Sequence, residues 1–191
     1  MKKHALLAAL SALTSTALIA APVAYELDPT HTYPSFEADH MGMSMWRGKF
    51  TKSSGKVTLD KEAGQGTLEV TVDMASIDFG LDPMNKAARG AEFFDTKKSP
   101  KATFKGKLDG FANGAPSRAV GDLTFHGVTR PVVLTLNSFK CMAHPMLKRD
   151  WCGADAQATI NREEFGMPMG KEWGFKMDVG LRIQVEAVAS K

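Results

Sequence analysis

Cysteine is scarce in this sequence, which contains only Cys141 and Cys152, both within the segment CMAHPMLKRDWC. Their spacing is far from the Cys-x-x-Cys of redox proteins, so the segment favours a structural disulfide across a short loop. Closing such a loop would stabilise the fold by about 2–3 kcal/mol in the chain-entropy model. A redox-active pair is the alternative.

The chain also lacks the common signatures of catalysis. It has no nucleophile-elbow motif, no phosphate-binding loop and no group of carboxylates at a defined spacing. His31, His40 and His126 would have to meet at one end of the fold to form a catalytic group, which makes catalysis the weaker alternative. We therefore expect a protein that is not an enzyme and that carries no cofactor.

Charge of one sign is not in excess either. The formal net charge is +3 at pH 7, and the two N-terminal lysines, Lys2 and Lys3, supply two of these charges. Binding to nucleic acid needs a clustered basic surface. The composition therefore argues against a nucleic-acid partner.

Only one long uncharged run is present, from Ala5 to Ala24, and it follows Lys2 and Lys3. A positive start, an apolar run and small residues at its end are typical of a secretory signal peptide. A membrane anchor is the alternative, but a run made mostly of alanine, serine and threonine is only mildly hydrophobic. We expect a signal peptide over residues 1–24, with cleavage after Ala20, Ala21 or Ala24, a periplasmic location, and one soluble domain over residues 25–191.

Alternating apolar and polar residues dominate the rest of the chain. In TLEVTVDM, Leu68, Val70, Val72 and Met74 fall on one face and polar residues on the other. Such period-two alternation is the mark of half-buried strands. It predicts strands in SFEADH, RGKFTKSSGKVTLD, TLEVTVDM, KATFKGKLDGF, AVGDLTFHG, VTRPVVLTLNSF, GADAQATINREEF and VGLRIQVEA.

One helix is predicted between these strands, in LDPMNKAARGAEFF. Asp82 is a suitable N-cap and Pro83 suits the first helical position. Apolar residues then follow helical spacing from Met84 to Phe94. The chain shows no repeat and no linker that would divide it.

Eight antiparallel strands predict an all-β fold, either a closed barrel or a sandwich. Closing the sheet removes its edges and leaves an interior that holds side chains or one small ligand. The ADAQATI strand would place Ala154, Ala156, Ala158 and Ile160 inside, and small residues leave space there. A sandwich with large residues opposite these alanines is the alternative that periodicity leaves open.

Four segments resemble the YceI-like family of polyisoprenoid-binding periplasmic proteins: YELDPTHTYPSFEADHMGMSMWRGKF, GAEFFDTKKSPKATFKG, GDLTFHGVTRPVVLTL and INREEFGM. The resemblance implies a lipocalin-like, eight-stranded antiparallel β-barrel with one short helix packed across it, and a tunnel that holds an isoprenoid chain. We read most of the matching positions as fold-defining rather than as ligand contacts. They are His31, His40, Phe93, Phe94, Asp95, Pro100, Phe104, His126, Gly127, Asn161, Arg162 and Phe165.

The function that the resemblance implies is a lipid-binding protein that carries or scavenges an isoprenoid, such as a polyprenyl or quinone-like chain. The tunnel residues would be apolar and inward-facing, and a plain hydrophobic core would use the same residues. Alternation predicts this set as Phe36, Leu68, Val70, Val72, Phe104, Leu123, Phe125, Leu134, Leu181, Ile183 and Val185.

The segment HMGMSMW lies between two predicted strands and has two interpretations. Flexible methionine side chains suit the entrance of an apolar pocket, whereas thioethers and imidazole are also ligands for Cu(I). The copper alternative would use His40, Met43 and His144 in a metal-binding or redox accessory protein. The favoured interpretation makes the mouth or lid of the barrel from His40, Met41, Met43, Met45, Trp46, Met84 and Phe94.

Lysines form a local basic strip at Lys97, Lys98, Lys101, Lys105 and Lys107. A solvated strand face that discourages edge pairing is one interpretation. Transient docking to an anionic membrane surface, from which a lipid would be collected, is the other. Nothing in the sequence indicates an oligomeric state.

Overall fold

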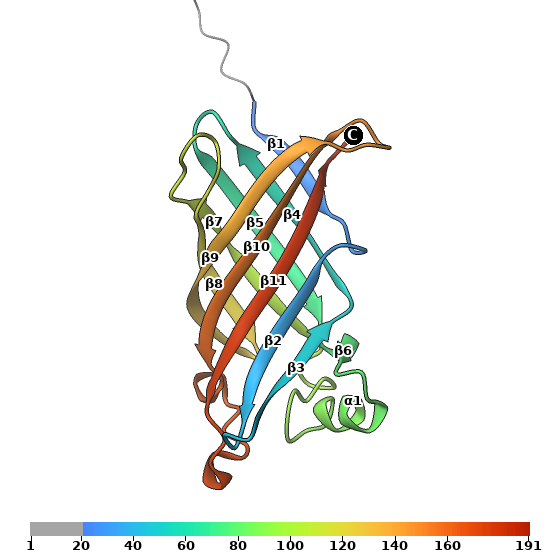
Figure 1. The fold of residues 1–191 in the computed structure, drawn as a ribbon, viewed down its shortest axis with the longest axis vertical. Coiled ribbons are helices and arrows are strands. Elements are labelled where there is room, and N and C mark those ends of the chain that lie inside the picture. Colours follow the sequence, from blue (N-terminus) through green and yellow to red (C-terminus); the bar gives the residue numbers. More distant parts are fainter. Residues whose placement is uncertain (1–20) are drawn as a thin grey trace, which may run out of the picture.

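The computed structural model describes residues 21–191, so most of the predicted signal peptide, residues 1–24, lies outside the described residues. Strands make up most of the described chain (Figure 1). The strands are β1 Val23–Leu27, β2 Tyr33–His40, β3 Ser44–Phe50, β4 Ser53–Asp60, β5 Gln65–Asp73, β6 Ile77–Asp78, β7 Lys101–Asp109, β8 Arg118–Phe125, β9 Val128–Ala143, β10 Asp150–Asn161 and β11 Asp178–Ala189. The helix α1 spans Asp82–Ala88, and short 3-10 turns span Met74–Ser76 (η1), Arg162–Phe165 (η2) and Lys171–Trp173 (η3).

The sheet closes on itself because β11 has neighbours on both sides. One edge of β11 pairs with β10, and the other pairs with β2 over Val179–Gln184 and with β1 over Ala187–Ala189. β1 and β2 therefore share one position in the barrel, and β3 and β4 share the next. The result is the predicted closed, eight-stranded antiparallel barrel, and the sandwich alternative is wrong.

Strands are found in all eight predicted segments, but RGKFTKSSGKVTLD holds two strands, β3 and β4, because the chain turns at Thr51 and Lys52. Two strands were missed, β1 and the two-residue β6. β1 is five residues long, VAYEL, and follows directly on the uncharged N-terminal run, so its alternation is too short to recognise. Its pairing joins the first and last parts of the chain, with Tyr25 opposite Ala189 and also opposite Val57. This pairing completes the barrel wall.

The helix is shorter than predicted, and Asp82 is not its cap. Leu81 is the N-cap, Asp82 is the first helical residue, and the helix ends after seven residues at Ala88. The side chain of Asn85 turns back and accepts a hydrogen bond from the Phe79 backbone amide at 2.7 Å, which fixes the entry of the helix. Turns replace the predicted helix up to Phe94. Within residues 21–191, no helix is both long and apolar enough to cross a membrane.

The interior is filled tightly near one end of the barrel. A cluster of buried residues packs there around Tyr25, and its other members are Leu27, Leu59, Cys152, Ala187 and Ala189. The Tyr25 hydroxyl donates to Asp150 at 2.7 Å, and the ammonium group of Lys61 reaches the same carboxylate oxygen at 2.7 Å. Burial and this hydrogen bond raise the pKa of Tyr25 above its ordinary range, so the hydroxyl stays protonated. We call this the closed end.

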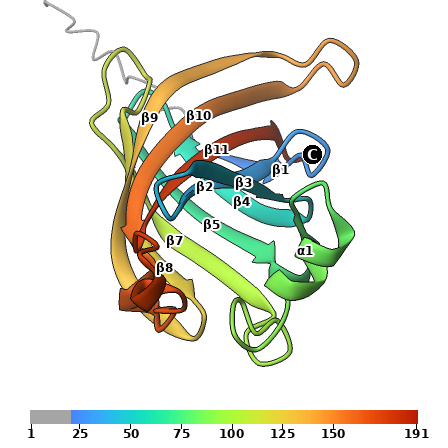
Figure 2. The ribbon, with the colours of Figure 1, turned by 60° about the horizontal axis from the view of Figure 1, so that its bottom comes forward.

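The disulfide expected from the sequence is present between Cys141 and Cys152, with an S–S distance of 2.01 Å. The two residues lie opposite one another on β9 and β10. Beyond them the β9–β10 hairpin extends past the barrel (Figure 2). The bond therefore joins the base of this hairpin at the closed end.

Candidate functional site: an apolar cavity

The barrel encloses a cavity of about 420 Å³, bounded almost entirely by apolar side chains. Several inward-facing residues, including Leu68, Val70, Leu181 and Ile183, are only partly buried. Since alternation points these side chains inward, their remaining exposure reflects hollow space next to them. The wall of β10 contributes small residues, Ala154 and Ala156, as the sequence suggested.

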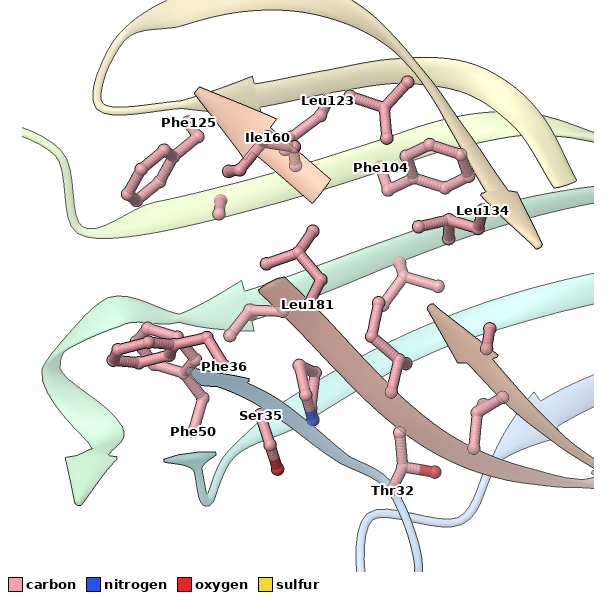
Figure 3. A pocket seen from close by; sticks show the side chains of 18 of the residues that line it. Thr32, Ser35, Phe36, Phe50, Phe104, Leu123, Phe125, Leu134, Ile160 and Leu181 are labelled. Atoms are coloured by element: carbon pink, nitrogen blue, oxygen red, sulfur yellow. The ribbon is translucent and has the colours of Figure 1, made fainter. Parts of the chain in front are cut away.

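Every residue predicted for the tunnel lies in the cavity wall. These residues are Phe36, Leu68, Val70, Val72, Phe104, Leu123, Phe125, Leu134, Leu181, Ile183 and Val185. Figure 3 shows Phe104, Leu134, Leu123 and Leu181 directed toward the same interior space. The placement follows from strand alternation, and ligand contact by these residues stays a prediction.

The predicted mouth residues divide into two groups. Trp46, Met84 and Phe94 line the cavity. His40, Met41, Met43 and Met45 are not part of its wall. Met41 and Met43 lie in the tight turn between β2 and β3, where Met41 has a φ of 55° and Gly42 a φ of 74°. The methionine side chains are exposed as a result, and Met43 is 72% exposed.

The opening of the cavity lies at the end that carries α1. Trp46 and Ala87 are the exposed members of the wall in the described part of the chain, and both belong to this end. At the opposite end, Tyr25, Leu27 and Leu59 are at most 7% exposed. We therefore call the α1 end the mouth.

Aromatic rings gather at the mouth. Phe94 lies between Phe36 and Phe125, with ring centroids 6.1 Å and 6.0 Å away, and these rings meet edge to face. Trp46 stacks on His40 at 4.0 Å and is met edge-on by Phe175. Such contacts contribute beyond the apolar area that they bury, by about 0.5–1.5 kcal/mol each. The mouth is therefore a fixed aromatic frame with α1 beside it.

Within the described residues, two charged side chains line the cavity, Asp39 and Arg162. Asp39 accepts a hydrogen bond from the Gly42 backbone amide at 3.0 Å and lies 3.9 Å from the ammonium group of Lys176. Arg162 begins η2, directly after β10. Its pKa is lowered because burial disfavours the charged form.

The residues of the copper alternative do not come together. His40 and Met43 lie by the β2–β3 turn at the mouth, and His144 lies in the β9–β10 hairpin at the closed end (Figure 1). The Nδ1 atom of His144 accepts hydrogen bonds from the backbone amides of Met146 and Leu147, both at 3.2 Å. Both bonds use the lone pair of Nδ1, so that nitrogen is not free to bind a metal.

Of the three histidines considered for catalysis, His31 lies apart from His40, at the end of β2, and from His126, in the turn after β8, both at the mouth end. His31 hydrogen-bonds to Asp28 at 2.7 Å beside Glu186, in the closed-end half of β11. This hydrogen bond raises the pKa of His31. His126 contacts the carbonyl oxygen of Phe165 at 3.1 Å, far along the barrel from His31.

Comparison with known proteins agrees with this architecture. The family model of the YceI-like domain matches residues 25–188. A UPF0312 protein of Shewanella denitrificans is 31% identical over 183 residues, covering 94% of this chain and 91% of the relative. A UPF0312 protein of Serratia proteamaculans is 30% identical and covers 94% and 92%.

Solved structures show the same fold. BcnA of Burkholderia cenocepacia superposes with a TM-score of 0.66 at 25% identity, covering 84% of this chain and 98% of that one. A polyisoprenoid-binding domain from Saccharophagus degradans superposes with a TM-score of 0.63 at 19% identity, covering 88% and 99%. The barrel fold and the family match lead to one conclusion: this chain belongs to the YceI-like family.

Proposed function

We propose that this protein binds one lipid with an isoprenoid chain in the barrel cavity and serves as its carrier or scavenger in the periplasm. The observation that carries this proposal is the apolar wall of a deep cavity that opens at one end. The likeness to a polyisoprenoid-binding domain of S. degradans supports it. No reaction is part of the proposal, and the role is binding without catalysis.

The size of the hydrophobic effect is sufficient for this role. Each methylene-sized group transferred from water into the cavity contributes about 0.8 kcal/mol. Ten such groups contribute roughly 8 kcal/mol, and association costs about 4 kcal/mol or more. A prenyl chain therefore binds without directional contacts along its length, which agrees with the near absence of polar groups in the wall.

Native mass spectrometry of the protein purified from the periplasm, with solvent extraction of what dissociates, tests this function. We expect one prenyl lipid per barrel, released on extraction. Copper bound without lipid would contradict the proposal and revive the metal-binding alternative. A bound lipid with a saturated acyl chain would keep the cavity as a lipid site and contradict the isoprenoid assignment.

Export to the periplasm is part of the proposal, and β1 bears on the cleavage site. Val23 and Ala24 pair with Leu59 and Thr58 of β4, and the Ser190 amide donates to the Ala24 carbonyl at 2.8 Å. Cleavage after Ala24 would remove these contacts from the barrel seam. Cleavage after Ala20 or Ala21 leaves β1 whole, and we propose one of these two sites.

We also propose that the lysine strip meets an anionic membrane surface. Lys101, Lys105 and Lys107 lie on β7 and are exposed. Lys105 lies 3.7 Å from Glu69, whereas Lys101 and Lys107 take part in no ion pair within residues 21–191. Near an anionic surface each lysine contributes about 1 kcal/mol, and salt screens the attraction.

Replacing Lys101 and Lys107 with glutamine is expected to weaken binding to phosphatidylglycerol vesicles about 30-fold at low salt, as measured by vesicle sedimentation. Replacing Lys140 and Lys148, on the β9–β10 hairpin, is the matched control and should leave binding unchanged. Absence of vesicle binding by the unmodified protein at low salt would remove the docking proposal.

A further inference from the structure

Arg162 is a cation in the wall of a mostly apolar cavity. The other charged member of the wall, Asp39, is partly offset by Lys176 at 3.9 Å and by the Gly42 amide. Arg162 has no such offset: among residues 21–191, no carboxylate lies within 4.0 Å of its guanidinium group. Within the described residues, no carboxylate therefore neutralises the charge of Arg162.

The hydrogen bonds of Arg162 leave capacity for a further acceptor. Nη1 donates to the Met167 carbonyl at 2.7 Å, and Nη2 donates to the Met169 carbonyl at 2.6 Å. Both acceptors are neutral. A guanidinium group carries five N–H donors in a planar fork, so these two bonds leave three donors. The two carbonyls hold the guanidinium in place without removing its charge.

Arg162 is half-buried, and a charge that has lost part of its hydration gains from pairing with an opposite charge. Burial lowers the pKa of Arg162, but an arginine remains charged at neutral pH. An anionic oxygen group is the natural partner, because arginine binds carboxylates and phosphates through two parallel hydrogen bonds.

The position of Arg162 fits the polar end of a lipid. Arg162 starts η2, and Phe165 at the end of η2 packs against Phe125, with centroids 5.6 Å apart. Phe125 in turn contacts Phe94 of the mouth. Arg162 therefore lies toward the mouth, away from Tyr25 at the closed end. A lipid that enters chain first would bring its head group to this level.

We propose that Arg162 binds the head group of the ligand, and that the cavity selects single-chain lipids that end in an anionic oxygen group, a phosphate or a carboxylate. The hydrocarbon chain extends from Arg162 toward Tyr25. This proposal rests on the proposed function, because it requires that a lipid chain occupies the cavity. It also revises the interpretation of Arg162 as a purely fold-defining residue.

Three ligands with the same 15-carbon chain test the proposal: farnesol, farnesoic acid and farnesyl phosphate. Titrations below the concentrations at which these lipids aggregate can be followed by tryptophan fluorescence, because Trp46 lines the cavity. We expect the unmodified protein to bind at least one anionic ligand about 10- to 100-fold more tightly than farnesol. The ratio between farnesoic acid and farnesyl phosphate then distinguishes a carboxylate from a phosphate.

The variant Arg162→Gln should abolish the preference for anionic ligands and leave the affinity for farnesol unchanged. Arg162→Lys should keep part of the preference, because it keeps the charge but not the planar fork. Arg182→Gln is the control, since Arg182 is an exposed arginine that pairs with Glu37 at 2.8 Å outside the cavity. It should behave like the unmodified protein.

Two outcomes would overturn the proposal without affecting chain binding. Equal affinity of the unmodified protein for farnesol and for both anions would show that the charge does not select a head group. An Arg162→Gln variant that weakens all three ligands alike would assign Arg162 to support of residues 166–170 only. Failure of every ligand and of longer prenyl lipids to bind would instead contradict the proposed function itself.

Discussion

Replacing Ile183 with tryptophan is expected to reduce the affinity for long-chain isoprenoids about 1000-fold. Ile183 lines the middle of the cavity and packs near Ala156 and Leu134. An indole ring there would separate the closed end from the mouth. Excluding about five methylene-sized groups of the chain removes roughly 4 kcal/mol of binding free energy, which corresponds to this factor. Titration with a long prenyl lipid measures the change.

The neighbouring position provides the control for this variant. Gln184 is exposed on the same strand and points away from the cavity, so Gln184→Trp should leave lipid affinity unchanged. Because the cavity has space for the new ring, Ile183→Trp should alter stability much less than tryptophan in a filled core would. Retention of the full affinity by a folded Ile183→Trp protein would contradict the cavity as the lipid site.

Replacing Gly121 with alanine is expected to destabilise the barrel by about 3 kcal/mol, at the upper end of the usual overpacking effect. Gly121 lies opposite Gly106 where β8 pairs with β7. A β-carbon at position 121 would overlap the Lys105 carbonyl oxygen and the Gly106 α-carbon. Both are backbone atoms, so the strands would have to move apart. Urea unfolding measures the difference in unfolding free energy.

Gly153→Ala is the matched control, because Gly153 also lies within a strand but has room. A β-carbon there would lie 3.4 Å from the flexible Glu186 side chain, which is an ordinary contact. This variant should change the unfolding free energy by well under 1 kcal/mol. If Gly121→Ala and Gly153→Ala unfold alike, close backbone approach between β7 and β8 does not limit the stability of the barrel.

Alternation is a local property, and this explains what could be predicted. Each strand places every second residue inside, so residues such as Val70 and Leu181 could be assigned to the interior from the sequence alone. Whether that interior is filled or hollow depends on how eight strands curve around one another. The alanines of β10 gave the one hint of space, and Ala154 and Ala156 do line the cavity.

The mouth was harder to predict because it is built from distant segments. Alternation continues from β2 through a tight turn into β3, which turns Met43 outward and Trp46 toward the cavity. Arg162 follows β10 in the segment INREEFGM, and its match to the family pattern led us to read it as fold-defining. Its lack of an ionic partner depends on all the segments around it, and no local pattern contains that information.

The cavity that the described residues enclose opens at the mouth, beside α1. Because the closed end is filled around Tyr25, the proposed lipid would leave through the mouth by which it entered, head group first. Each additional isoprene unit held inside the cavity would then slow release of the proposed lipid, since roughly 4 kcal/mol of burial is undone per five carbons. Chain length would therefore set the residence time, and rapid transfer of a long chain would need an acceptor that contacts the mouth beside α1.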